Sequence, residues 1–424
     1  MKYRAFTLSN FKNIPQIKHL SEEQIFDIEV VGEVLPFKTN NYVIEELIDW
    51  AHFETDPIYI LTFPQKDMLS NKHYDRMAEL IRNGASKSER LETANQIRME
   101  LNPNPAGQEH NVPEICGEKL VGLQHKYNET VLFFPSQGQS CHAFCTFCFR
   151  WSQFSGISEL KFAMKQVDLI IDYIRENPQI TDLLITGGDP MIMKTKVFEQ
   201  YIDALLAADL PNLKTIRIGT KTLGYWPYRY TTDEDASQLL DVFKKIVNKG
   251  INLAIMAHFN HINEMSTITA EQAIKKIQAT GAIIRTQTPL LKHLNDDADM
   301  LARMWRKQVN LGLIPYYLFV ARETGAQEYF ALNLEEAYNI YRNAYIQVSG
   351  ICRTVRGPVM SAHPGKVQVA GISEINGEKV FVLNFIQARN TDWVGKPFYA
   401  KYNPDALWVN DLEPAFEDKF IFEA

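Results

Sequence analysis

The stretch TVLFFPSQGQSCHAFCTFCFR, residues 130–150, joins a short apolar run to a loop that contains three of the five cysteines in the chain. The run TVLFFP predicts a buried strand, because it is apolar and too short for a helix. Cys141, Cys145 and Cys148 follow it with C-x3-C-x2-C spacing. Three thiolates at this spacing can hold three corners of a four-iron cluster and leave one iron open. The alternative is zinc, with His142 or a distant residue as fourth ligand, although zinc sites usually pair two CxxC segments.

The same order, a short apolar run and then a helical pattern, recurs along the chain after the cysteine loop. The apolar runs cover residues 182–186, 215–219, 252–256, 282–286 and 315–320. With TVLFFP they predict six parallel strands covered by helices, in either a barrel or an open α/β sheet. Chemistry in both folds lies at the C-terminal ends of the strands. The cysteine loop and the segments TGGDP, IGTKT, AHFNH and RTQTP all follow such ends.

The pattern divides the chain into three parts. Residues 1–110 are predicted to be a helical region, with NNYVIEELIDW (40–50) as one of its helices. The proline-containing segment NPNPAGQEHNVPE (102–114) interrupts the helical pattern, and residues 111–350 form the α/β core. In residues 351–424, KVQVAGI and KVFVLNF predict strands that form either a C-terminal arm or cap, or the finishing edge of the sheet.

Composition narrows the classes of function. The 424 residues carry a formal net charge of −7, so the chain as a whole offers no basic field for nucleic acid. No stretch is apolar for long enough to be a signal peptide or to span a bilayer. Few cysteines and no such signal argue against disulfides and for a reducing compartment, so we expect a cytoplasmic protein without membrane partners.

Five motifs in order, CHAFCTFCFR, LLITGGDP, IRIGTKT, AHFNHINE and RTQTPLLKHLND, resemble the lysine 2,3-aminomutase family of radical SAM enzymes. The resemblance extends from about Gly122 to Phe385 and implies a partial barrel of six βα units. It implies an isomerase that cleaves S-adenosylmethionine at a 4Fe–4S cluster, and a 5′-deoxyadenosyl radical that abstracts hydrogen from an amino-acid-like substrate. It also implies an electron donor such as ferredoxin or flavodoxin, a homo-oligomer, and pyridoxal phosphate bound as a Schiff base to a lysine.

The S-adenosylmethionine site would lie after the second, third and fourth strands. The glycines of TGGDP let the backbone approach the methionine end, and Asp189 is expected to accept from its ammonium group. The residues that the resemblance and this reasoning assign to the site are Thr186, Gly187, Gly188, Asp189, Thr220, Lys221 and His258. His258 also fits a structural histidine at a strand end.

The resemblance places pyridoxal phosphate on Lys366, which Pro364 and Gly365 are expected to expose on a turn. The alternative is an ordinary surface lysine. Arg150 matches the position that binds the substrate α-carboxylate, for which a guanidinium is suited because it can bind bidentately. The remaining positions matched to the cofactor are Lys126, Tyr127, Gln287, Tyr316 and Tyr317.

Three departures from the family pattern bear on the substrate and the second cofactor. Thr130 replaces the second arginine of the H-R-Y-x-x-R stretch that holds the cofactor phosphate, and the glycine run before the lysine is shortened to HPGK. Arg322 and Ser361 stand where lysine-specific enzymes carry two aspartates. An arginine repels an ammonium group and suits a carboxylate or a phosphate, unless it pairs locally with Glu323.

Three hypotheses follow. The first is a pyridoxal-dependent 2,3-aminomutase whose substrate is an amino acid other than lysine, and acidic. The second is a radical SAM enzyme on the same scaffold that does not use pyridoxal phosphate. The third, a non-enzymatic zinc or nucleic-acid module, is opposed by the negative charge. No structural zinc is expected, and Cys116 and Cys352 are expected to have no role.

Overall fold

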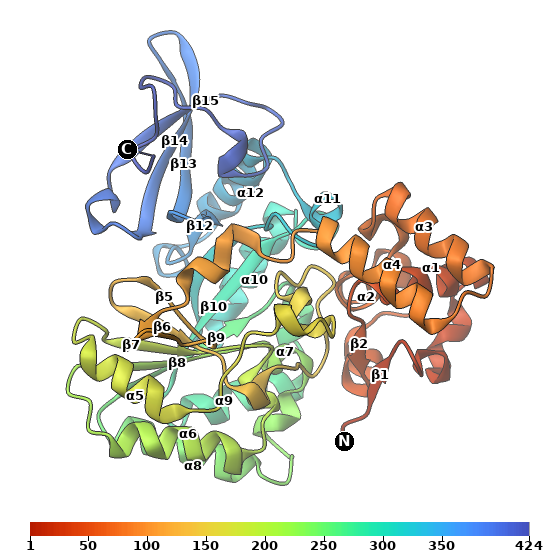
Figure 1. Ribbon diagram of the computed structural model, residues 1–424, viewed down its shortest axis with the longest axis horizontal. Helices are drawn as coiled ribbons and strands as arrows, with labels where there is room; N and C mark the ends of the chain where they lie inside the picture. The colour runs from red at the N-terminus through yellow and green to blue at the C-terminus, as the bar shows by residue number, and fades with distance from the viewer. Residues whose placement is uncertain (424) are drawn as a thin grey trace.

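The computed structural model describes residues 1–423. Its main feature is an 11-stranded sheet in which the strands lie in chain order, from β5 to β15 (Figure 1). Neighbouring strands from β6 to β12 are parallel. The first six of them are β6 (Thr130–Phe133), β7 (Asp182–Ile185), β8 (Thr215–Thr220), β9 (Asn252–His258), β10 (Ile283–Leu290) and β11 (Ile314–Val320).

A helix follows each of these six strands and covers the outer face of the sheet (Figure 1). These helices are α5 (Val167–Glu176), α6 (Thr195–Ala207), α8 (Ala236–Asn248), α9 (Ile268–Gln278), α10 (Ala298–Asn310) and α12 (Leu334–Ile346). The sheet curls until β14 approaches β5 but does not close. The partial barrel of six βα units implied by the resemblance is therefore confirmed.

Side chains alternate along each barrel strand because successive residues of a strand point to opposite faces. On β8, Ile216 and Ile218 are buried in the apolar core, whereas Arg217 and Gly219 line a cavity on the concave face. The helices supply the other half of that core; α8 contributes Leu239, Phe243 and Ile246, which recur on one helical face. The outer face of the sheet therefore stabilises the fold, and its inner face is free to form a site.

The N-terminal region packs beside the barrel, at the right of Figure 1. Its helices are α1 (Glu22–Val34), α2 (Pro57–Thr62), α3 (Asn71–Arg82) and α4 (Lys87–Glu100), and its two paired strands are β1 (Ala5–Thr7) and β2 (Lys38–Asn40). The helix expected over residues 40–50 is shorter than predicted, because the helical part covers residues 41–47, with Val43–Leu47 as a π-helix. Asn40 ends β2, and its side chain accepts from Val43 N, so the chain turns there.

The C-terminal strands continue the same sheet. β12 (Arg356–Ser361) is parallel to β11, and β13 (Gly365–Ile375), β14 (Glu378–Ala388) and β15 (Pro397–Lys401) follow antiparallel. The segment was expected to form either a C-terminal arm or cap, or extra strands at the edge of the sheet. The structure shows the second, because β12 to β15 belong to the 11-stranded sheet. The strands also lead away from the barrel, at the top of Figure 1.

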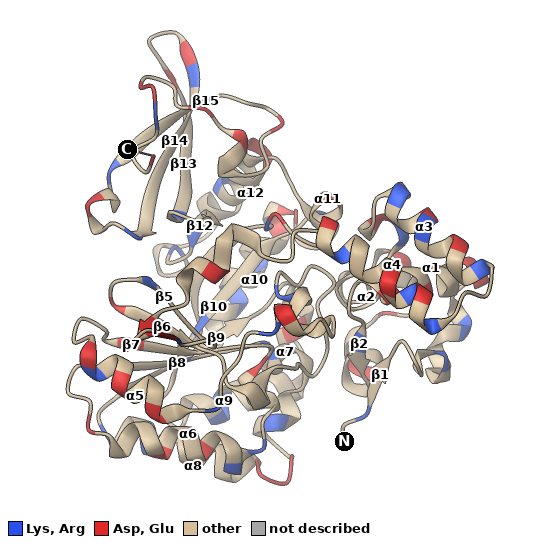
Figure 2. Ribbon diagram, in the orientation of Figure 1, with Lys and Arg blue, Asp and Glu red and all other residues tan. Residues whose placement is uncertain are grey.

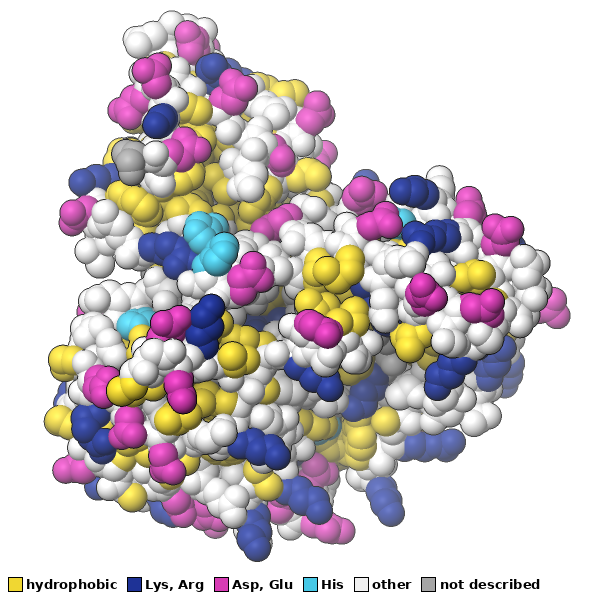
Figure 3. Space-filling model, viewed as in Figure 1, with side chains coloured by type: hydrophobic (Ala, Val, Ile, Leu, Met, Phe, Trp, Pro, Cys, Tyr) yellow, Lys and Arg dark blue, Asp and Glu magenta, His cyan; other side chains and the backbone are white. Residues whose placement is uncertain are grey.

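Three short elements complete the fold: a hairpin of β3 (Glu114–Ile115) and β4 (Glu118–Lys119), and the helices α7 (Thr222–Tyr225) and α11 (Gln327–Phe330). Charged residues lie mainly on the outer helices and loops, while the strands carry few (Figure 2). Both signs are interspersed over the face shown in Figure 3. Over residues 1–423, every helix is too short or too polar to cross a bilayer.

Candidate active site

A cavity of about 340 Å³ opens on the concave face of the barrel, at the C-terminal ends of its strands. It is lined by the barrel strands, the cysteine loop, the turn Pro105–Asn111 and the start of β13. The predicted site residues that line it are Lys126, Tyr127, Cys141, Cys145, Cys148, Arg150, Thr186, Gly187, Gly188, Thr220, Lys221, His258, Gln287, Tyr317, Arg322, Ser361 and Lys366. Asp189 and Tyr316 are the two predicted residues that do not.

The three clustered thiols lie on one wall of this cavity. Burial raises the pKa of Cys145 to about 12 and that of Cys148 to about 11, so a bound metal would have to displace the thiol protons. His142, the suggested fourth zinc ligand, is engaged elsewhere. Its Nδ1 lies 3.1 Å from Thr222 Oγ1 and its ring stacks on Trp226. Among residues 1–423, no three His, Cys, Asp or Glu side chains are grouped as ligands of a single metal ion.

The glycines of TGGDP allow two loops to meet backbone to backbone. A Cβ atom on Gly188 would lie 2.5 Å from Ser140 O and 2.7 Å from Ser140 N. Asp189 N donates to Ser140 O at 2.7 Å and to Gly138 O at 3.1 Å. The loop after β7 therefore fixes the cysteine loop through main-chain contacts, and the chemistry of this site fits a cluster with three thiolate ligands.

Asp189 is engaged by hydrogen bonds within the fold. It is buried, and its carboxylate accepts hydrogen bonds from Met191 N, Lys221 N, Thr220 Oγ1 and Thr222 Oγ1 at 2.8–2.9 Å. These donors occupy the carboxylate, which does not face the cavity. Asp189 thus joins the loop after β7 to the loop after β8, and its contact with a ligand ammonium group stays a prediction.

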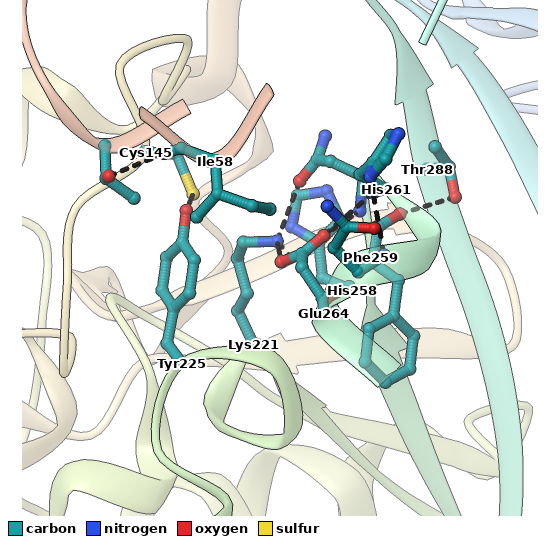
Figure 4. A network of polar contacts seen from close by, with 12 residues as sticks. Ile58, Cys145, Lys221, Tyr225, His258, Phe259, His261, Glu264 and Thr288 are labelled. Carbon is teal, nitrogen blue, oxygen red and sulfur yellow. Dashed lines mark hydrogen bonds and ion pairs between the residues drawn. The ribbon is translucent and has the colours of Figure 1, made fainter. Parts of the chain in front are cut away.

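Lys221 is held by a buried polar network, shown in Figure 4. Its Nζ donates to Asn260 Oδ1 at 2.8 Å and forms an ion pair with Glu264, which is fully buried. On the other side of Lys221, Tyr225 Oη lies 3.3 Å from Cys145 Sγ. His258 packs edge-on against Phe147, and burial lowers the pKa of this histidine well below its usual value, so it is neutral at pH 7.

Lys366 lies in β13 and points into the cavity, so both the exposed turn and the ordinary surface lysine are wrong. Its Nζ lies 4.4 Å from the centroid of the Tyr127 ring and 5.5 Å from that of Tyr317. It donates to Gln387 Oε1 at 2.5 Å. Burial, and then the positive charge of Arg217, lower the pKa of Lys366 well below its usual value. The lowered pKa increases the share of the neutral amine, which is the form that acts as a nucleophile.

Tyr316 lies outside the cavity wall, between two guanidinium groups. Its ring centroid is 5.0 Å from Arg285 Cζ and 4.4 Å from Arg356 Cζ. Tyr317, the next residue on β11, does line the cavity. The hydroxyl groups of Tyr317 and Tyr127 are both buried, and neither has a hydrogen-bond partner among residues 1–423. Two phenolic donors are therefore available to a ligand beside Lys366.

Arg217 and Gln387 are two of the polar cavity-lining residues that were not identified from the sequence. Arg217 on β8 forms a two-bond ion pair with Asp182 on β7. A charged residue inside the apolar run TIRIG was a signal that could have revealed it. Gln387 on β14 lies opposite Lys366 on β13. This pairing depends on the register of the β13–β14 hairpin, which the local sequence does not specify, so Gln387 could not be identified from the sequence.

Arg150 and Arg322 approach the same aromatic ring, with Cζ atoms 5.1 Å and 4.5 Å from the centroid of Phe149. Arg150 Nη1 is buried without a hydrogen-bond partner, and burial, with the nearby charge of Arg322, lowers the pKa of Arg150 to about 9. Arg322 Nη2 donates to Ser361 O at 3.1 Å. Glu323 Oε1 instead accepts from Ala106 N, so the structure does not show the local Arg322–Glu323 pair.

The cavity wall has an excess of positive charge. It includes six basic side chains and, among the described residues, no Asp or Glu. Lys221 and Arg217 are paired with carboxylates behind the wall. The other four basic side chains, for which no ion pair is found among residues 1–423, are Lys126, Arg150, Arg322 and Lys366. Such a site favours a ligand with more than one negative group.

No protein-family model matches the sequence. An Aquifex aeolicus (strain VF5) protein described as "Putative L-lysine 2,3-aminomutase" is 30% identical over 395 residues, covering 93% of this chain and 92% of that protein. L-lysine 2,3-aminomutase of Clostridium subterminale is 30% identical over 254 residues, which are 60% of this chain and 58% of that protein. Among solved structures, Streptococcus suis SuiB aligns with a TM-score of 0.36 and 14% identity, over 77% of this chain and 63% of that chain.

Proposed function

Because this chain belongs to the lysine 2,3-aminomutase family of radical SAM enzymes, we propose that it is a pyridoxal-dependent 2,3-aminomutase for an acidic amino acid. The observation that carries the proposal is the excess of basic groups in the cavity: Arg150 and Arg322 have no ion-pair partner among the described residues, and the described wall contains no carboxylate. An enzyme for lysine needs an acidic partner for the side-chain ammonium group, and this wall offers none.

The 4Fe–4S cluster and S-adenosylmethionine of radical SAM enzymes supply, when bound, the radical that abstracts a hydrogen atom from the substrate. Cys141, Cys145 and Cys148 would hold the cluster, because their thiols share one wall of the cavity. Gly187 and Gly188 would let the methionine end of S-adenosylmethionine approach the backbone beside them. The paired Lys221 and the neutral His258 would lie further along the same wall.

Two guanidinium groups support a dicarboxylic substrate. Arg150 would bind the α-carboxylate. Its Nη1 is buried and has no partner among the described residues, so folding has already removed water from this group and a carboxylate would supply the missing hydrogen bond. Arg322 would bind the side-chain carboxylate near Phe149. Moving the amino group of aspartate between its two carbons returns aspartate. Glutamate is therefore the shortest acidic amino acid for which the migration gives a new compound.

The residues around Lys366 fit pyridoxal phosphate. The pKa of the lysine is lowered, which favours attack on an aldehyde, and the unpartnered hydroxyls of Tyr127 and Tyr317 flank it. Burial, with the charges of Arg322 and Arg389, lowers the pKa of Lys126 to about 7, so a bound phosphate would restore its charge. When bound through Lys366, the cofactor supplies the conjugated system through which an amino group can migrate.

Thr130 favours a second candidate, a radical SAM enzyme without pyridoxal phosphate. Its hydroxyl donates to Asp182 at 2.9 Å, so this position contributes no cation to a phosphate. Reduction of the pyridoxal-treated protein with borohydride, followed by peptide mapping, distinguishes the two. We expect the label on Lys366, none in Lys366→Ala, and conversion of glutamate but not lysine under reducing conditions. An unlabelled Lys366 in a protein that cleaves S-adenosylmethionine would overturn the pyridoxal-dependent function.

A further inference from the structure

Tyr225 is a buried tyrosine at the end of α7, beside the cysteine loop. Its side chain is 1% exposed. Its backbone oxygen accepts from Asn40 Nδ2 at 3.0 Å, and Lys221 Nζ lies 4.6 Å from the centroid of its ring. Lys221 is itself held by Glu264, so its amine has a fixed position beside the ring of Tyr225 (Figure 4).

The hydroxyl of Tyr225 is directed at a cluster cysteine. Tyr225 Oη lies 3.3 Å from Cys145 Sγ. Among the described residues, Cys145 Sγ is the one hydrogen-bond partner of this hydroxyl. A phenol ordinarily titrates near pH 10, so this hydroxyl has a proton to donate at neutral pH. A metal-bound thiolate has no proton to give, so the phenol must be the donor once a cluster is present.

We infer that Tyr225 is a tuning residue for the iron–sulfur cluster and makes it easier to reduce by donating a hydrogen bond to Cys145 Sγ. When one electron passes from the reductant to the cluster, the negative charge on its sulfur ligands increases. A donor to one of those sulfurs stabilises the reduced form more than the oxidised form and raises the midpoint potential. The inference goes beyond the proposed substrate and second cofactor, and it rests on the assignment of Cys145 as a cluster ligand.

The test is the Tyr225→Phe variant, reconstituted with iron and sulfide under anaerobic conditions and titrated with reductant while the reduced cluster is followed by EPR. We expect at least a threefold lower ratio of reduced to oxidised cluster at the wild-type midpoint. A one-electron couple changes by 59 mV for each factor of ten, so this corresponds to a shift of about 28 mV to lower potential.

Tyr42→Phe is the matched control, because it removes the buried hydroxyl that lies 2.7 Å from Thr267 Oγ1 without touching a cysteine. The midpoint of this variant should equal that of the wild type. An unchanged midpoint in Tyr225→Phe with full iron content would overturn the inference. A wild-type protein that assembles no cluster would instead overturn the assignment of the cysteines.

A second measurement applies if Tyr225→Phe does not assemble a cluster. Wild-type protein and Tyr42→Phe, exchanged into D2O and reduced, should both show a deuteron coupled to the cluster by electron–nuclear double resonance. The inference would also be overturned if neither sample showed such a coupling.

Discussion

Lys38 Nζ donates a 2.7 Å hydrogen bond to the carbonyl oxygen of Cys141, which connects β2 of the N-terminal region to the first cysteine of the loop. The backbone completes this link, because Phe144 N donates to Lys38 O at 2.8 Å. Asn40 Nδ2 adds a bond of 3.1 Å to His142 O. The N-terminal region therefore holds the cysteine loop in shape, in addition to covering the side of the barrel.

Lys38→Met should weaken cluster binding by the cysteine loop, because methionine has no donor for the carbonyl oxygen of Cys141. We expect a reconstituted variant to release iron to a chelator several times faster than the wild type, with little change in helix content. Lys12→Met is the control, since Lys12 pairs with Glu29 away from the loop. Equal release rates in all three proteins would show that the contact does not support the cluster.

Gly188→Ala should separate the loop after β7 from the cysteine loop. The three nearest neighbours of the added methyl group are all backbone atoms of Ser140, which cannot rotate away as a side chain does. We expect loss of most of the bound iron, measured by iron content per chain after reconstitution. Gly350→Ala is a control, because a Cβ there meets nothing within 4 Å. A Gly188→Ala protein with full iron content would contradict the close approach.

The reaction of Lys366 with pyridoxal phosphate should depend weakly on pH. The neutral fraction of an unperturbed lysine falls about tenfold for each unit below pH 10.4. Because burial and nearby cations lower the pKa of Lys366, its neutral form persists to lower pH. Borohydride trapping between pH 7 and 9, with Nα-acetyl-lysine as reference, should give a much flatter profile for Lys366. A profile parallel to the reference would refute the shift.

Arg322→Gln should weaken binding of an acidic substrate, because it removes the cation proposed for the side-chain carboxylate. A hydrogen bond to a charged group contributes about 1.5–3 kcal/mol, which corresponds to roughly 10- to 150-fold in KM for glutamate. The effect on kcat should be smaller. Arg342→Gln, at an exposed position on α12, should leave KM unchanged. A normal KM in Arg322→Gln would exclude this contact.

Lys126→Met should stabilise the cofactor-free protein at low pH. The pKa of Lys126 is about 7 in the folded protein, and about 10.4 is usual for an unfolded chain. The unfolded state binds more protons between these values, so the cost of the buried charge is full below pH 7 and is relieved as the pH rises. We expect the variant to gain at least about 1 kcal/mol in unfolding free energy at pH 6. The gain should shrink towards pH 10, and a variant less stable than the wild type at pH 6 would contradict this.

The repeating parts of the fold were predictable from the sequence, because each barrel strand is a short apolar run followed by an amphipathic helix. The cysteine loop was predictable for a similar reason: its spacing is local. The surroundings of Asp189 were not, because its donors Thr220 and Thr222 come from the next βα unit. The burial of Lys366 depends in the same way on the pairing of β13 with β14.

The order of the strands also fixes an order of assembly during synthesis. Since the strands lie in the sheet in the order in which they leave the ribosome, each new strand finds its neighbour already made. Cys141 to His258 emerge with the first four barrel strands, whereas Lys366 and its partner Gln387 come from β13 and β14. A nascent chain can therefore form the wall with the cysteines while the lysine that faces it is still untranslated.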